Sequence, residues 1–108
     1  MDQIVVQRTF QVTRPNGVQH ELTLRIGVPR NTGEDWEWYT DVELWLDSEL
    51  LESMEIFGPA DSLSSLTQAL WIGGIRVRVH QQRYKEKGWR LTWLGTDDVD
   101  IPTPPSST

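Results

Sequence analysis

A regular alternation of side-chain character in residues 36–47 constrains the fold of this chain more than any other feature. In WEWYTDVELWLD, one parity holds Trp36, Trp38, Val42, Leu44 and Leu46, with Thr40 as its polar member, and the other holds Glu37, Tyr39, Asp41, Glu43 and Trp45. Because successive residues of a β-strand point to opposite faces of the sheet, this pattern predicts a strand with one buried and one exposed face. The exposed face combines carboxylates with large aromatic side chains.

Two further alternating segments, residues 4–13 and 18–28, predict a β-hairpin around the sequence RPNG. A two-residue Asn-Gly turn would pair even with odd positions and mix the two faces. A three-residue loop, Pro15-Asn16-Gly17, keeps the apolar residues together, and Gly17 suits the left-handed conformation that such a loop needs. The expected cross-strand pairs are Phe10 with Leu22, Val6 with Ile26, and Val12 with His20.

The second half of the chain predicts a helix whose end the sequence leaves open. SMEIF (53–57) is typical of a short strand, and Asp61 or Ser62 can cap a helix that begins at SLSSLTQALW. Either this helix continues through GG at 73–74, or the glycines end it and residues 75–82 form a strand that pairs with WRLTWLG (89–95). The helix is expected to pack through Leu63, Leu66 and Leu70 on Trp38, Leu44 and Leu24.

These elements predict an α+β fold, with an antiparallel sheet of four to five strands and one helix packed on one face. A chain of 108 residues fits a single domain, which we place at residues 1–96. Residues 97–108 are acidic and rich in proline and serine, and we predict that they form a C-terminal tail.

The charges of the chain are unevenly distributed around a net charge of -6. Between Arg30 and Arg76 every charged residue is acidic, so this region would repel nucleic acid. It is either a solvated acidic surface balanced by the basic end of the helix or a docking face for a basic protein. No window approaches the roughly 18 apolar residues of a membrane span, and MDQIVVQRTF lacks the basic start and apolar run of a signal peptide. We therefore expect a cytoplasmic protein with no membrane or nucleic-acid partner.

The residues that usually carry catalysis or bind metals are scarce. The chain has no cysteine, which excludes disulfides, thiolate zinc sites and cysteine nucleophiles. His20 and His80 lack a second ligand at helical spacing, and there is no Gly-x-Ser-x-Gly elbow. Asp41 and Glu43 lie in a run of like charge, whereas acid–base catalysis needs an apolar cleft that raises one pKa. We expect no catalytic residue, no metal and no cofactor.

Several short segments occur in an order that suggests a family. They are IVVQRTF, LTLRIGVP, EIFG, the helix start Asp61-Ser62-Leu63, then Gln68-Ala69-Leu70 and a closing Trp93-Leu94-Gly95. This order resembles a family of small bacterial proteins catalogued only as a domain of unknown function. One departure is that DSL and QAL are separated here, where the family runs them together. The resemblance implies a helix that continues past the glycines, and the plan is similar to that of immunity proteins, the partners of bacterial toxins, by analogy of architecture alone.

The exposed parity of residues 36–47 is the predicted functional surface. Aromatic side chains among carboxylates are typical of the centres of protein interfaces. We predict a non-enzymatic acidic binding protein, of the immunity or inhibitor kind, that neutralises a basic toxin by stoichiometric binding. The predicted partner-binding residues are Glu37, Tyr39, Asp41, Glu43, Trp45 and Asp47.

Three alternatives stay open at the level of sequence. The first is a small-ligand or enzymatic site between helix and sheet near Arg8 and His20. The second is an acidic mimic of nucleic acid that inhibits a DNA-binding protein, which would need carboxylates spaced like phosphates along one edge. The third is structural: Trp45 is covered by the C-terminal tail around Ile101 and Pro102.

Overall fold

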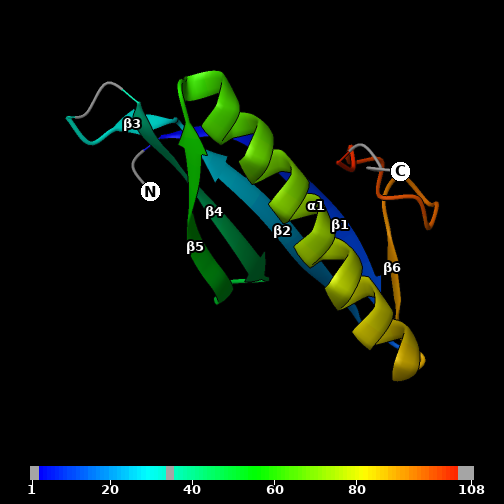
Figure 1. Ribbon diagram of the computed structural model, residues 1–108. Helices are drawn as coiled ribbons and strands as arrows, with labels where there is room; N and C mark the ends of the chain where they lie inside the picture. Colours follow the sequence, from blue (N-terminus) through cyan, green and yellow to red (C-terminus); the bar gives the residue numbers. More distant parts are fainter. Residues whose placement is uncertain (1–2, 34–35, 105–108) are drawn as a thin grey trace.

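One long helix lies across one face of an antiparallel sheet in the computed structural model, which describes residues 3–33 and 36–104 (Figure 1). In chain order the elements are β1 (Ile4–Thr13), β2 (Gln19–Gly27), β3 (Arg30–Asn31), β4 (Glu37–Leu46), β5 (Glu49–Pro59), α1 (Ser62–Glu86) and β6 (Arg90–Thr92). The α+β class and the single helix packed on an antiparallel sheet are confirmed. The predicted number of four to five strands is wrong, because the sheet has six.

The additional strand, β3, pairs with the same edge of β4 as β2 does. Because β5 occupies one edge of β4 along its whole length, β2 and β3 share the other edge, at residues 42–46 and 38–39 of β4. Val28 and Pro29 separate the two strands, and proline has no N–H with which to continue the ladder. The order across the sheet is therefore β5, β4, β2 with β3, β1 and β6.

The first hairpin has the predicted register. Phe10 pairs with Leu22, and both side chains are fully buried. The loop closes through hydrogen bonds from the Arg14 N–H to the Val18 carbonyl (2.8 Å) and from the Gly17 N–H to the Arg14 carbonyl (2.9 Å). Gly17 has a φ of 88°, the left-handed conformation that the three-residue loop was expected to need.

Helix α1 runs without a break from Ser62 to Glu86, so the alternative of a strand at residues 75–82 is wrong. Asp61 caps the helix, accepting a hydrogen bond from the Ser64 N–H at 2.8 Å. The glycine pair permits close packing: a Cβ at Gly73 would meet Leu24 Cδ1 at 3.1 Å. Over the described part of the chain, no helix is both long enough and apolar enough to cross a membrane.

Small residues, rather than the predicted leucines, form the centre of the contact between helix and sheet. The buried stripe of α1 begins with Ser65, Ala69 and Gly73. Leu66 and Leu70 flank it, partly buried against the core, but Leu63 is 68% exposed and its predicted packing is wrong. At about 100° per residue, Leu63 lies nearly opposite Ser65 around the helix, which turns it to solvent.

Trp36 was also expected on the buried side of the strand, but its side chain is 57% exposed. Helix α1 reaches the sheet where Ser65 contacts Gly58, the partner of Trp38 in the ladder. Trp36 precedes β4 and lies beyond this point. The alternation of residues 36–47 therefore reports burial only where the helix covers the sheet.

The segment predicted as a tail contributes to the core through Val99 and Ile101, both buried. Arg8 holds it by donating from Nη1 to the carbonyls of Val99 (3.0 Å) and Asp100 (2.8 Å). On the helix, Arg78 donates to the Ile101 carbonyl at 2.6 Å. Packing of the domain therefore extends past residue 96 to at least Ile101, and residues 105–108 lie outside the described chain.

Candidate functional site

The odd-numbered residues of β4 lie on the sheet face that α1 does not cover. Their even-numbered neighbours Thr40, Val42 and Leu44 are fully buried on the helix side, where Thr40 hydrogen-bonds to Ser65 at 2.8 Å. The side chains of the predicted site residues in this strand are neither fully buried nor fully exposed: Glu37, Tyr39, Asp41, Glu43 and Trp45. The structure thus places five of the six predicted residues together on one face.

Asp47, the sixth, does not join this face. It lies in the turn between β4 and β5 with a φ of 52°, and its carboxylate accepts from the Glu21 N–H (3.0 Å) and pairs with His20 Nδ1 (2.7 Å). The Glu21 backbone hydrogen bond, followed by the His20 contact, lowers the pKa of Asp47 below its usual range. Asp47 therefore organises the turn and the His20 side chain.

Neighbouring strands bring two arginines onto the same face. Arg30 Nη2 of β3 lies 3.1 Å from both Asp41 Oδ1 and Glu55 Oε1, and the Arg30 guanidinium lies 5.9 Å from the centre of the Tyr39 ring. Arg25 of β2 lies 5.3 Å from the ring centre of Trp45. These cations offset part of the negative charge that residues 36–47 carry. The parity of residues 18–28 already indicates the face of Arg25, whereas nothing in the sequence indicates the pairing of β3.

Strand β5 adds two exposed apolar side chains that the sequence interpretation missed. Phe57 lies opposite Tyr39, with ring centres 5.5 Å apart, and is 43% exposed. Leu50 lies opposite Trp45 and is 44% exposed. We call the resulting surface the β4–β5 face: Tyr39, Asp41, Glu43 and Trp45 from β4, with Leu50, Glu55 and Phe57 from β5. Two apolar pairs flank its charged centre, where Arg30 bridges two carboxylates.

Trp45 is held in place by its neighbours on the sheet. Its indole Nε1 donates to Glu43 Oε1 at 3.1 Å, and its side chain is only partly buried. Ile101 packs on the other side of the sheet, where it contacts Gly74 of the helix. The alternative in which the C-terminal segment covers Trp45 is therefore wrong.

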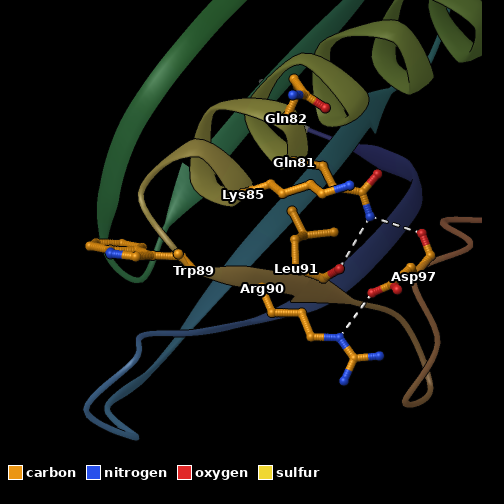
Figure 2. A pocket seen from close by; sticks show the side chains of 8 residues that line it. Gln81, Gln82, Lys85, Trp89, Arg90, Leu91 and Asp97 are labelled. Atoms are coloured by element: carbon orange, nitrogen blue, oxygen red, sulfur yellow. Dashed lines mark hydrogen bonds and ion pairs between the residues drawn. The ribbon is translucent and has the colours of Figure 1, made fainter.

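A shallow cavity of about 470 Å³ lies between the end of α1 and β6 (Figure 2). Three of its polar residues are bonded to one another or to the backbone: the Gln81 amide donates to the carbonyls of Leu91 (3.2 Å) and Asp97 (2.8 Å), and Arg90 Nε pairs with Asp97 at 3.0 Å. Neither Arg8 nor His20 lines this cavity. Arg8 is engaged with the C-terminal segment and His20 with Asp47, so neither side chain is placed to receive a ligand.

A cluster of three ionisable groups ties β5 to the helix. Glu52 accepts from Arg76 Nε at 2.8 Å and pairs with His80 Nε2 at 2.5 Å. Burial alone would raise the pKa of Glu52, but the hydrogen bonds from His80 and Arg76 outweigh it and lower the pKa. Across residues 3–33 and 36–104, no three His, Asp or Glu side chains gather as a metal site would require.

Comparison of the chain with protein-family models, with curated proteins and with solved structures finds no match. The resemblance to a family of unknown function therefore stays a prediction. The β4–β5 face combines partly exposed apolar pairs with a partly compensated acidic centre.

Proposed function

We propose that this protein is a non-enzymatic binding protein that holds a partner protein on its β4–β5 face. The observation that carries the proposal is the pairing of partly exposed aromatic side chains with exposed apolar ones, Tyr39 with Phe57 and Trp45 with Leu50, on a sheet face that no other element within residues 3–33 and 36–104 covers. Aromatic anchors of this kind supply most of the energy at protein interfaces. Here the strand pairing also orders them before any partner arrives, which reduces the entropy lost on binding.

The charges around the apolar pairs favour a basic partner. Arg30 is shared by Asp41 and Glu55, and Arg25 lies opposite Glu43 in the ladder between β2 and β4, so the three carboxylates of the face outnumber the two arginines beside it. The whole chain carries a net charge of -6. Such a field speeds the encounter with a positively charged surface and disfavours acidic competitors.

More specifically, we propose that the protein is a cytoplasmic inhibitor of the immunity kind, which neutralises a basic toxin by occupying its surface. A preformed contact face needs neither cofactor nor turnover for this task. The nucleic-acid mimic is less well supported, because Asp41 and Glu55 are partly neutralised by Arg30 and apolar pairs interrupt the row of carboxylates.

The direct experiment is capture from cells of the source organism with three baits. These are the natural chain, the double variant Trp45→Ala/Phe57→Ala, and Ile75→Ala as a control, since Ile75 is exposed on the helix. The proposal expects a basic protein that the natural chain and the control retain and the double variant loses. If that protein arrests growth when produced alone, co-expression of this chain should restore growth. Equal capture by all three baits would contradict the use of this face.

A further inference from the structure

Strand β5 has a free edge. It pairs with β4 through ten residues from Glu37 to Leu46, and it forms one margin of the sheet, with β6 at the other (Figure 1). Within the described chain, no backbone hydrogen bond links the outer edge of β5 to another segment. The ladder with β4 is regular from Glu52 to Pro59, since its only register shift lies between Leu44 and Trp45.

Two hydrogen bonds fix which groups of β5 point outward. The Ala60 N–H donates to the Trp36 carbonyl at 3.2 Å, so this pair and every second pair after it are hydrogen-bonded pairs. On the other side of β4, the Asp47 N–H donates to the Glu21 carbonyl at 2.8 Å. This bond agrees with the first, because it assigns the odd-numbered residues of β4 to β2 and leaves the even-numbered ones to bond to β5. The residues of β5 bonded to β4 are therefore Gly58, Ile56 and Met54. The residues whose N–H and C=O groups point to the free edge are Ser53, Glu55 and Phe57.

The side chains at these outward-pointing positions lie on the solvent face, and all of them are exposed. Glu55 and Phe57 belong to the β4–β5 face, so a strand added here would extend that face. A cation opposite Glu55 on this face, and an apolar residue beside the partly buried Met54 and Ile56 on the opposite face, would complement it, because cross-strand pairs of this kind stabilise antiparallel sheets.

The usual protections of an edge strand are weak here. A charge pointing inward often blocks such an edge, but the inward charge of β5, Glu52, is already bound by Arg76 and His80. Pro59 lacks an N–H and closes the edge only at its last residue. The middle of β5 therefore remains competent to pair.

We propose that the partner binds by adding an extended segment of alternating basic and apolar residues as a strand along the free edge of β5. This rests on the proposed function and adds how the partner is held, by backbone hydrogen bonds alongside the side-chain contacts of the face. A second copy of the chain fits less well, because antiparallel self-pairing centred on Glu55 would place like charges opposite each other.

Amide hydrogen exchange with model peptides tests this directly. One peptide alternates lysine and valine over about seven residues, a common strand length, and its matched control has glutamate in place of lysine. The lysine peptide should slow exchange of the Ser53, Glu55 and Phe57 amides by about fivefold or more, the worth of one hydrogen bond. The amides of Met54 and Ile56, already bonded to β4, serve as internal controls and should not change. Equal protection by both peptides would overturn the proposal.

A variant and a modified peptide separate edge pairing from other modes of binding. Ser53→Pro removes an outward N–H and should weaken the lysine peptide by about fivefold, while Ser53→Ala should leave its binding unchanged. If Ser53→Pro does not fold, a lysine peptide N-methylated at its lysine residues, whose N–H groups would point to β5, makes the same test on the natural chain and should bind about fivefold more weakly. Unchanged binding in that test would overturn the proposal.

The outcomes distinguish this inference from the proposed function. If the lysine peptide shifts the Trp45 indole resonance but protects none of the outward amides, edge pairing fails while binding on the face stands. If the outward amides are protected, but the cellular partner is still captured by Trp45→Ala/Phe57→Ala, the edge stands and the use of the face fails. Protection of the same amides in the protein alone at raised concentration would assign the edge to a second copy and overturn the proposal.

Discussion

Gly58 of β5 lies so close to Ser65 of α1 that a Cβ built on the glycine would stand 2.1 Å from the Ser65 Cα. This contact sets where the helix meets the sheet, since both atoms belong to backbones held by their own hydrogen bonds. Because neither backbone can yield cheaply, Gly58→Ala should destabilise the protein by about 3 kcal/mol, at the upper end for overpacking. Urea unfolding measures this, with Ser53→Ala on the same strand as the control; an unchanged midpoint for Gly58→Ala would refute the closeness of the contact.

The short alternation of the hairpin was enough to predict its register because its two faces differ in polarity. A three-residue loop keeps Phe10, Val12 and Leu22 on the same side and a two-residue loop does not, so parity and turn geometry agree. The same logic placed five residues of β4 on one face. Alternation is a reliable guide where one neighbour covers one side of a strand.

The residues through which the helix packs on the sheet could not be predicted from an apolar pattern in the same way. Ser65, Ala69 and Gly73 form the buried stripe, but small residues give no apolar periodicity, so the pattern is dominated by leucines such as Leu63. The position of Phe57 and Arg30 on the face depends on how β5 and β3 pair with β4. That pairing is decided by tertiary structure, and the sequences of β3 and β5 contain no local pattern that predicts it.

Gly17 should tolerate only residues that accept a positive φ. Gly17→Val should cost about 1 kcal/mol or more, because a β-branched side chain resists the observed φ of 88°. Gly17→Asn is the matched control, since asparagine enters the left-handed region more readily. Thermal unfolding of both variants makes the comparison, and equal melting temperatures would argue against a strained loop.

Truncation within the C-terminal segment should destabilise the whole domain. Ile101 packs on Gly74 and is only 8% exposed, so Ile101→Ala should cost about 2–4 kcal/mol. Pro102→Ala, at the exposed position that follows, should change stability by less than about 0.5 kcal/mol. Chemical unfolding of the two variants measures the contrast; similar stabilities would mean that the segment adds little to the core.

Glu52 should make part of the stability depend on pH. The hydrogen bonds from His80 and Arg76 hold its folded-state pKa below the usual value of about 4.3, which it regains on unfolding. Its contribution is therefore fully present above the unfolded pKa and is lost as pH falls through the folded pKa. Glu52→Gln should be less stable than the natural chain at neutral pH, and the difference should shrink below about pH 4.

Unfolding curves at several pH values test this dependence. Glu49→Gln is a suitable control, because Glu49 is exposed on the same strand and forms none of the ion pairs seen between described residues. The free energy of unfolding of Glu49→Gln should differ little from that of the natural chain, and the difference should be nearly constant with pH. A Glu52→Gln difference that grows on acidification would contradict the sign of the effect.

Binding kinetics should separate the apolar pairs of the β4–β5 face from its charges. Trp45→Ala removes an anchor that lies opposite Leu50 and beneath Arg25, so it should weaken binding by about 2 kcal/mol, mainly through faster dissociation. Glu43→Lys should mainly slow association, because charges steer the encounter of two proteins. The loss caused by Glu43→Lys should shrink as salt rises, since screening acts over about 8 Å at physiological ionic strength.

Glu86→Lys makes the same change of charge at the exposed end of α1 and serves as the control for Glu43→Lys. Surface-plasmon measurements of the captured partner at low and high salt give both rate constants for each variant. If the two charge reversals slow association equally, the whole acidic chain, rather than this face, steers the partner. If Trp45→Ala leaves dissociation unchanged, the apolar pairs are not the anchors, because a buried aromatic contact cannot be removed from an interface without shortening the lifetime of the complex.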